Sequence, residues 1–253
     1  GGVAFDSREV GAGDLFVALK GELTDGHRFV DQAFAKGAAG AIVSTPVAHP
    51  HVLVADTTAA LNALGVAARA RTAAKIAGVT GSVGKTGTKE ALAAALARAN
   101  KGPVHRSVKS YNNHTGVPLS LSRMAAETAF GVFEMGMNHA GEIAALTRLV
   151  RPHVALITAI APAHIENLGS MEAIADAKGE IFQGLEPGGT AIVPYDTPYR
   201  DQLLAHARAH AAHVISFGRD AGADVSAREV VQMDHGNMVV ATMPGAELSF
   251  TLA

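Results

Sequence analysis

The chain has 253 residues, of which 48% are hydrophobic and 17% charged, and its formal net charge is −2, so it can bury a substantial core and is not expected to be disordered. No block of lysine or arginine stands out, which argues against nucleic acid or a membrane surface as the main partner, and the absence of cysteine excludes disulfides, thiolate zinc sites and cysteine nucleophiles. The sequence has no apolar run of about 18 residues, so no membrane span is expected. The opening Gly-Gly-Val-Ala-Phe-Asp lacks the features of a secretory leader, so we expect a cytoplasmic protein. We also expect a monomer.

Strand-like and helix-like segments alternate through the first part of the chain. The predicted strands are 15–19, 41–44 and 52–55, and the predicted helices are 27–36 and 57–74. The first of these helices is amphipathic and stops at Gly37, a favourable residue after a helix C-terminus. These elements predict a small N-terminal α/β domain over residues 1–74.

A second series of elements follows. Its predicted strands are 76–79, 130–135, 154–160, 191–193 and 214–216, and its predicted helices are 86–99, 117–124, 142–150, 171–185 and 201–212. Apolar strands separated by helices indicate a mostly parallel sheet with helices on both faces. The last segments, 225–231, 238–242 and 248–252, indicate a small antiparallel tail. The predicted fold class is therefore α/β, with a sheet domain of the phosphate-loop type over residues 75–253.

A glycine-rich turn, 78–86, joins the first strand of the second series to its helix. Glycines let backbone N–H groups converge on phosphate oxygens, and the following helix N-terminus adds partial positive charge. Lys85 can reach the β- and γ-phosphates, and the Thr86 hydroxyl can ligate Mg²⁺. In the strict phosphate-loop pattern the first glycine lies one residue closer to Gly84 than it does here. The alternative interpretation is therefore a glycine-rich turn that binds no ligand. The strand-to-helix position of Gly-Lys-Thr favours phosphate binding.

Two further predicted strands end in groups that suit a metal–phosphate site. Glu134 lies at the end of an otherwise apolar strand, and His164 follows the strand predicted at 154–160. Ligands of open parallel sheets bind beyond the carboxyl ends of the strands, so both side chains are expected near the phosphate turn as Mg²⁺ ligands, directly or through water. Taken singly, Glu134 could instead cap a loop and His164 could be structural. Their shared edge favours the functional interpretation.

Other polar residues leave alternatives open. Asn112 and Asn113 precede the helix predicted at 117–124, and their amides could hold a phosphate or a metal-bound water, or could serve a turn. Lys178 is predicted from composition alone to be a solvated helical lysine. One predicted helix face carries histidines at metal-ligand spacing, but the Ala-His-Ala-Arg pattern around them favours a solvated face; these are His206, His210 and His213.

These motifs resemble the Mur ligases of bacterial cell-wall synthesis. The turn 78–86 looks like their ATP loop, including the displaced first glycine. The other stretches that carry the resemblance are 112–118, 134–143, 161–166 and 178–182, together with Asp6-Ser7-Arg8 and Asp25-Gly26-His27 near the start. The resemblance runs through most of the chain, and the combination of motifs is highly specific.

The resemblance implies a role for each matching position. Lys85 and Thr86 would hold ATP and one Mg²⁺, and Glu134 and His164 would serve magnesium ions. Lys178 matches a lysine that the family often carbamylates, which would turn a cation into an anion able to support a second Mg²⁺ and reverses the solvated interpretation. Catalytic roles are thus implied for Lys85, Glu134, His164 and Lys178. The implied nucleotide-binding residues are Gly81, Ser82, Gly84, Lys85, Thr86, Asn112, Asn113 and Asn138. The implied residues for the uridine-diphosphate substrate are Ser7, Arg8, Asp25 and His27.

The implied activity is an ADP-forming amide ligation in peptidoglycan precursor synthesis. Within the family, the stretches are most similar to the member that adds D-alanyl-D-alanine to UDP-N-acetylmuramoyl-tripeptide through an acyl phosphate. The alternatives are a family member that adds a single amino acid, diaminopimelate or lysine, and a nucleotide-binding module without turnover.

The sequence departs from the family pattern at Gly87, where many members have threonine. A His-Asn stretch for adenine and a third domain are expected to follow Ala253, so the adenine grip and the full dipeptide site are expected beyond this chain.

Overall fold

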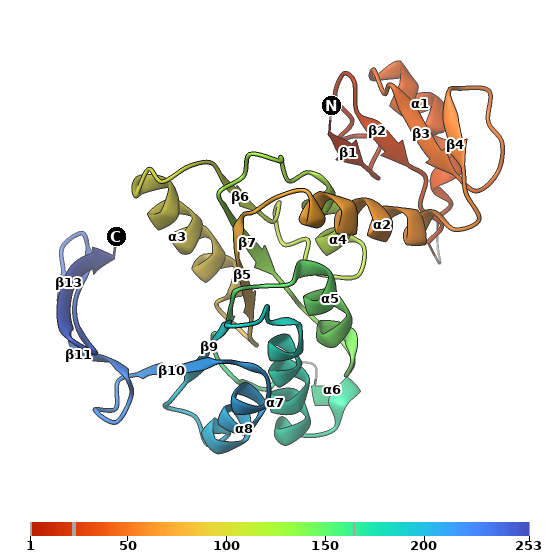
Figure 1. Ribbon diagram of the computed structural model, residues 1–253. Coiled ribbons are helices and arrows are strands. Elements are labelled where there is room, and N and C mark those ends of the chain that lie inside the picture. The colour runs from red at the N-terminus through yellow and green to blue at the C-terminus, as the bar shows by residue number, and fades with distance from the viewer. Residues whose placement is uncertain (1, 22–23, 164, 253) are drawn as a thin grey trace.

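The computed structural model describes residues 2–21, 24–163 and 165–252, and it contains two separate sheets (Figure 1). The first sheet is parallel throughout in the order β1-β2-β3-β4. Its elements are β1 (Val3–Ala4), β2 (Leu15–Val17), the 3₁₀ helix η1 (Gly26–Phe29), α1 (Val30–Ala35), β3 (Gly40–Val43) and β4 (His51–Leu53). Side chains alternate between its faces, so Phe16 packs with α1 while Val17 packs toward Leu61 and Leu119. Both faces are therefore buried, as expected of a parallel sheet.

The second sheet has nine strands in the order β13-β12-β11-β10-β9-β8-β5-β7-β6. Its strands are β5 (Lys75–Thr80), β6 (Val104–Arg106), β7 (Phe130–Glu134), β8 (Val154–Ile157), β9 (Thr190–Pro194), β10 (His213–Gly218), β11 (Val225–Met233), β12 (Gly236–Met243) and β13 (Ala246–Leu252). All pairings from β6 across to β11 are parallel, and the last two are antiparallel. The predicted α/β fold class is confirmed.

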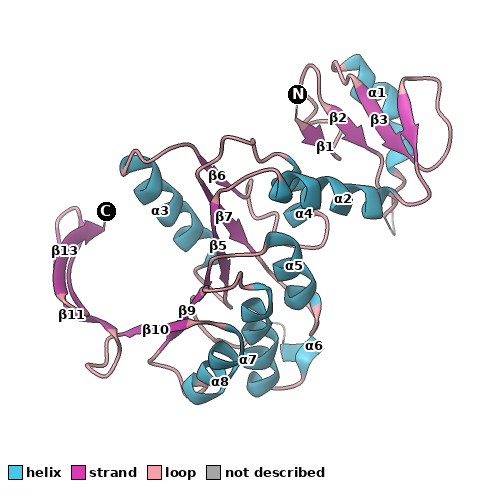
Figure 2. Ribbon diagram, viewed as in Figure 1, coloured by secondary structure: helices cyan, strands magenta, loops and turns pink. Residues whose placement is uncertain are grey.

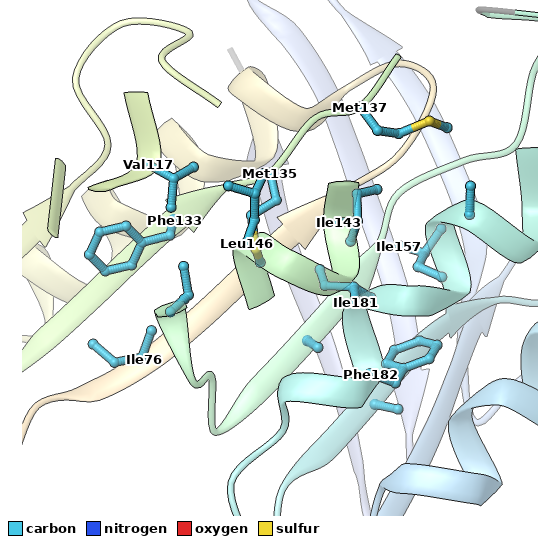
Figure 3. Close-up of a cluster of buried hydrophobic side chains, with 14 of the residues drawn as sticks. Ile76, Val117, Phe133, Met135, Met137, Ile143, Leu146, Ile157, Ile181 and Phe182 are labelled. Atoms are coloured by element: carbon cyan, nitrogen blue, oxygen red, sulfur yellow. The ribbon is translucent and has the colours of Figure 1, made fainter. Parts of the chain in front are cut away.

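Helices lie on both faces of the second sheet, unevenly (Figure 2). Its helices are α2 (Thr57–Ala70), α3 (Lys85–Arg98), α4 (Gly116–Ser122), α5 (Glu142–Val150), α6 (Ile165–Leu168), α7 (Met171–Gly179), η2 (Glu180–Gly184) and α8 (Arg200–His210). On one face, Val79 and Val132 pack with Ala93 of α3. On the other, Figure 3 shows Phe133 of β7 and Met135, the residue after the strand, beside side chains of α4, α5 and η2. The result is a three-layer arrangement around β5, β7 and β8.

The helix α2 connects the two sheets (Figure 1). Asp56 caps its N-terminus by accepting from the N–H groups of Thr58 and Ala59. At its other end the Arg69 guanidinium donates to the backbone oxygens of Val150 and Arg151. Arg71 donates likewise to Met124 O. These arginines satisfy carbonyls at the ends of α5 and α4, which helix geometry leaves without partners.

Several predicted elements differ from the observed ones. The strands β1 and β6 were not predicted: one has two residues and the other three, too few for a periodic pattern. The helix predicted at 171–185 changes to 3₁₀ geometry at Glu180. His213 starts β10 and is not on the face of α8 that carries the other two histidines, so the three-histidine helix face was wrong. The antiparallel tail is confirmed, but β11 pairs with β10 and so extends the main sheet.

Among the described residues, no helix combines the length and the apolar character needed to cross a bilayer. The final three strands form a curved ribbon that projects from the sheet beyond β10 (Figure 1). The join between ribbon and sheet is narrow, because only Phe217↔Val225 and Gly218↔Ser226 pair across it.

Candidate functional site

The phosphate turn lies between β5 and α3, as its sequence predicts. Gly84 is the N-cap of α3 and has φ +83°, a left-handed conformation that favours glycine. Gly81 is required for space: a Cβ there would lie 1.9 Å from Thr158 Oγ1. The turn therefore has the local geometry that brings backbone N–H groups and the positive end of a helix to one place.

The segment after β8 braces this turn. The Thr158 hydroxyl lies 2.5 Å from Val83 O and 3.2 Å from Thr80 O. Ser82 donates its N–H to Ala159 O at 2.8 Å, and its hydroxyl bonds both the N–H and the carbonyl of Ala161. Both polar groups of Ser82 thus bond to protein atoms in this structure, and its predicted contact with nucleotide stays a prediction.

Lys85 arches back over the turn. Its Nζ donates to Gly81 O at 2.7 Å. Partial burial lowers the pKa of Lys85 below its ordinary value, and the nearby Glu134 charge opposes this shift. A flexible ammonium held by one neutral carbonyl is well placed to exchange that partner for a phosphate oxygen, which binds a cation more strongly.

Glu134 ends β7 and faces the phosphate turn. Its side chain is 1% exposed, and its two oxygens have different partners. Oε2 accepts from the Thr86 hydroxyl at 2.9 Å, and Oε1 accepts from Asn112 Nδ2 at 2.7 Å. Lys89 Nζ lies 3.8 Å from Oε2. A buried polar side chain needs such partners to replace the water that it loses, and the arrangement joins the predicted metal residues Thr86 and Glu134.

A cavity of about 210 Å³ lies beside these groups. It is lined by Lys85, Asn112, Asn113, Gly136, Met137, Asn138, Glu142 and Lys178. Five residues predicted for the nucleotide or the metal therefore share one cavity, although they come from four separate stretches of sequence. The chain can bring them together because β5, β7 and the strands beside them are parallel and end at the same edge.

Lys178 is buried, with 2% of its surface exposed, so its composition-based prediction as a solvated lysine was wrong. It lies in the last turn of α7, and the helix turns this position toward the cavity rather than toward solvent. Burial lowers the pKa of Lys178 to about 8, and the charge of Lys85 adds to the effect. At neutral pH this amine is therefore much closer to losing its proton than an ordinary lysine.

The loops around the cavity are held by side-chain caps. Asn113 Oδ1 accepts from Gly116 N at 2.9 Å at the start of α4. Glu142 accepts from Asn138 N at 2.7 Å, and Glu180 accepts from the N–H groups of Gly141 and Ala144 at the start of α5. Glu142 and Glu180 were not predicted, although both lie in the matching stretches and acidic residues commonly cap helix N-termini. The sequence left open whether Asn113 serves a turn, and the structure shows that it does.

His164 lies outside the described residues, so its predicted metal role stays a prediction. Two of the other histidines, His206 and His27, have partners of a structural kind. His206 Nε2 lies 2.8 Å from Asp176 Oδ1 on neighbouring helices. His27 accepts from Ser44 N through Nε2 at 2.8 Å and faces Asp25 Oδ1 through Nδ1 at 2.6 Å. His27 therefore links η1 to the end of β3, and Asp25 caps η1.

The donor set near the turn suits Mg²⁺ bound together with phosphate. The Thr86 hydroxyl and the Glu134 carboxylate are oxygen ligands, which Mg²⁺ prefers. Within the described ranges, no group of three or more His, Asp or Glu side chains forms a complete cage for a metal ion. A magnesium ion at Thr86 and Glu134 would therefore take most of its remaining ligands from phosphate oxygens and water, as is usual for this ion.

A second cavity, of about 380 Å³, lies at the carboxyl end of β1 in the first sheet. Its lining residues are Phe5, Asp6, Ser7, Arg8, Thr24, Phe29 and Gln32. Arg8 forms a two-point pair with Asp6, at 2.9 and 2.6 Å, and this guanidinium holds the pKa of Asp6 down at about 2. Of the predicted substrate residues, Ser7 and Arg8 line this cavity, whereas Asp25 and His27 are outside its lining.

Comparisons with known proteins agree with this geometry. The sequence profile of the Mur ligase middle domain matches residues 79–253, and that of the Mur ligase family catalytic domain matches residues 1–102. The chain belongs to the Mur ligase family. Among the curated relatives of this Mur ligase chain is the UDP-N-acetylmuramoyl-tripeptide–D-alanyl-D-alanine ligase of Bacillus subtilis (strain 168), 39% identical over 98% of the chain and 53% of the relative. The ligase of that name from Escherichia coli (strain K12) is 43% identical over 77% of the chain and 43% of the relative.

Solved structures of Mur ligases have the same fold. MurF from Acinetobacter baumannii superposes with a TM-score of 0.87 at 37% identity, over 99% of this chain and 55% of that one. The MurF ligase of Thermotoga maritima, solved in complex with ADP, gives a TM-score of 0.83 at 28% identity, over 99% and 57%. This Mur ligase chain thus spans about half the length of the relatives it matches.

Proposed function

We propose that this chain supplies the ATP-binding part and the nucleotide-substrate part of a ligase that adds D-alanyl-D-alanine to UDP-N-acetylmuramoyl-tripeptide. The observation that carries the proposal is the meeting of the phosphate turn with a buried carboxylate, through the 2.9 Å bond from Thr86 to Glu134. The acceptor and donor substrates are those in the names of the relatives at 36–43% identity. Residues 1–74 would bind the uridine-diphosphate substrate and residues 75–253 would bind ATP. ATP and such precursors are cytoplasmic, which is where we place the enzyme.

In this proposal the polar residues of the phosphate turn and of the cavity beside it have defined tasks. The turn N–H groups and Lys85 bind the phosphates of ATP, and Thr86 and Glu134 hold Mg²⁺. Bound there, the ion would neutralise charge on the transferring phosphoryl group. Lys85 would move its Nζ from Gly81 O to the γ-phosphate and follow the developing charge. Asn112, Asn113 and Asn138 line the same cavity, and they would orient the phosphates or the substrate carboxylate.

The chemistry requires an activated acyl group. A carboxylate resists attack by an amine because oxide would have to leave. An oxygen of the substrate carboxylate attacks the γ-phosphorus, the bond to ADP breaks, and an acyl phosphate forms. The dipeptide amine then attacks the acyl carbon, phosphate departs, and the amine loses a proton as the amide forms. The chain contributes position and charge compensation to these steps rather than a covalent group.

At the first sheet, Ser7 and Arg8 would contact the uridine-diphosphate end of the substrate. The Arg8 side chain is 79% exposed at the rim of the cavity, so its guanidinium can exchange Asp6 for a diphosphate, which it binds in the same two-point manner. Phe29, 38% exposed on the lining, offers an aromatic surface on which a pyrimidine can stack.

The first test is nucleotide binding by the 253-residue chain itself. Calorimetric titration with ATP in Mg²⁺ should give saturable binding. Lys85→Ala should abolish it, and Glu134→Ala should remove its dependence on Mg²⁺ while leaving weak metal-free binding. Equal affinity in the wild-type chain and Lys85→Ala would remove the phosphate turn from the proposal.

The second test concerns the acceptor. ADP release by the full-length gene product should require both the uridine-linked tripeptide and D-alanyl-D-alanine, and Lys85→Ala should abolish it. Diaminopimelate or lysine in place of the dipeptide separates the family members that add one amino acid. Release that depends on neither substrate would favour a nucleotide-binding module without ligation.

A further inference from the structure

Lys89 is a fully buried lysine, with 0% of its side chain exposed, in the second turn of α3. It lies one turn beyond Lys85 and one turn before the buried Ala93, on the inward stripe of the helix. Removing an ammonium group from water is costly unless fixed partners replace the water. None of the tasks assigned above uses Lys89, so its burial needs another explanation.

Its partners are main-chain oxygens of a neighbouring segment. Lys89 Nζ donates to Ser107 O at 3.1 Å and to Lys109 O at 2.5 Å. It also lies 3.2 Å from Glu90 Oε1 and 3.8 Å from Glu134 Oε2. The two carbonyls belong to residues 107–113, which lead from the end of β6 to the start of α4 (Figure 1). One ammonium thus fastens this segment to the helix of the phosphate turn.

The 107–113 segment in turn holds Glu134. Ser107 Oγ accepts from the Glu134 N–H at 3.2 Å, and Asn112 Nδ2 donates to Glu134 Oε1 at 2.7 Å. Between these two contacts, Lys109 has φ +52°, a conformation that L-residues adopt only where their surroundings hold them. The two carbonyls that Lys89 binds flank this bend, with one of them on Lys109 itself.

We propose that Lys89 is a positioning residue for the magnesium–nucleotide site: it fixes the 107–113 segment so that Asn112 and Ser107 orient Glu134. This inference rests on the proposed function, because it concerns the same site. An apolar residue in place of Lys89 would leave the buried Ser107 carbonyl and the part-buried Lys109 carbonyl without this donor, and the segment would move to find water for them. Asn112 would then leave Glu134, and the carboxylate would lose its fixed direction toward Thr86.

The experiment compares four forms of the 253-residue chain: wild type, Lys89→Met, Asn112→Ala, and Lys101→Met as an exposed lysine control. ATP is titrated calorimetrically at Mg²⁺ concentrations from zero, in EDTA, to saturation. Lys89→Met is expected to weaken Mg²⁺-dependent ATP binding roughly ten- to hundredfold, which corresponds to losing one or two buried polar contacts. Binding in EDTA should be nearly unchanged, and hydrogen exchange should accelerate over 107–113. The Lys101→Met control should match wild type.

The outcomes separate this inference from the proposed function. Absence of Mg²⁺-dependent ATP binding in the wild-type chain would overturn the proposed function first. If the wild type binds and Lys89→Met binds equally well with unchanged exchange over 107–113, the positioning role is overturned. A Lys89→Met chain that weakens binding equally in EDTA and in Mg²⁺ would show a general structural role instead.

Asn112→Ala keeps the test decisive should Lys89→Met not fold. The inference requires it to lose the same Mg²⁺ dependence, and retention of that dependence overturns the inference. Where both single variants fold, the double variant should lose little more than either one, because the two residues act on Glu134 through one segment.

Discussion

Lys178 shows how strongly its surroundings change the chemistry of one side chain. Burial and the charge of Lys85 lower its pKa from 10.5 to about 8. At pH 7.5 about a quarter of such an amine is unprotonated, against about one part in a thousand of an ordinary lysine. Only the unprotonated amine attacks carbon dioxide, forming an N–C bond and losing a proton to give a carbamate anion. The cavity therefore favours the modification that the family resemblance implies, which remains a proposal for this chain.

We predict that Lys178 takes up carbon dioxide near neutral pH. With ¹³C-bicarbonate, the wild-type chain should show a carbamate ¹³C resonance that grows between pH 7 and pH 8.5, because the unprotonated fraction rises over this range. Lys178→Met should lack the resonance, and Lys101→Met should keep it. A resonance of equal intensity in Lys178→Met would assign the carbamate to another amine.

The same burial should make Lys178 costly to the fold in carbon dioxide-free buffer. A pKa lowered from 10.5 to about 8 corresponds to about 3 kcal/mol as an upper estimate. Because the folded chain releases this proton more readily than the unfolded chain, the cost is fully present below pH 8 and disappears as pH rises toward 10.5. Lys178→Met should therefore raise the free energy of unfolding in urea at pH 7, and its advantage should shrink by pH 9.5. An advantage that is constant with pH would contradict the electrostatic cause.

At the scale of elements, two glycines at the start of α3 have opposite demands, one as its N-cap and one within its first turn. Gly84 needs its left-handed φ of +83°, whereas Gly87 lies inside the helix with nothing within 4 Å of where a Cβ would be. Glycine in a helix interior costs about 1 kcal/mol relative to alanine. Gly87→Ala should therefore stabilise the chain by about 0.5–1 kcal/mol in urea unfolding, and Gly84→Ala should destabilise it by about 1 kcal/mol or more. A loss on Gly87→Ala would mean that the first turns of α3 are not regular helix in solution.

The elements that the sequence predicts best are those whose causes are local. The phosphate turn was predictable because Gly81, Gly84 and Lys85 carry its geometry in their own backbone and spacing. Lys89 was within reach of the same reasoning, since it shares the buried stripe of α3 with Ala93. The short strand β6 was not, because three residues carry no period and its place depends on pairing with β7.

The sequence predicted where the site lies better than it predicted which atoms are in contact there. That Glu134 meets the phosphate turn follows from the rule that parallel strands end at one edge. What each polar atom bonds depends on segments distant in sequence, so the sequence did not indicate that Ser82 bonds Ala161 or that His27 bonds Ser44. For Lys178, composition misled because burial is set by how α7 packs. Lys178 faces the cavity and is buried, although its charged neighbours along the helix are typical of a solvent-exposed face.

For the whole molecule, the central question is how the two sheets stay together. Leu61 of α2 and Leu119 of α4 cover the second face of the first sheet. Glu9, in the segment between β1 and β2, accepts from the Lys109 ammonium and the Tyr111 hydroxyl of the 107–113 segment. The same segment that orients Glu134 thus also holds the sheet that carries Ser7 and Arg8, which places both proposed ligand sites on one connected framework.

Arg69 should be a main anchor of this framework. Its guanidinium is 5% exposed, donates to Val150 O and Arg151 O at 2.9 Å each, and lies 3.5 Å from Glu186. Arg69→Met keeps the apolar stem but leaves the buried Val150 carbonyl and the part-buried Arg151 carbonyl without this donor, so the free energy of unfolding in urea should fall by about 2–4 kcal/mol. The exposed Arg28→Met should change it by less than about 0.5 kcal/mol. A similarly small change in Arg69→Met would show that α2 is held by its apolar contacts alone, and that the arginine caps add direction without stability.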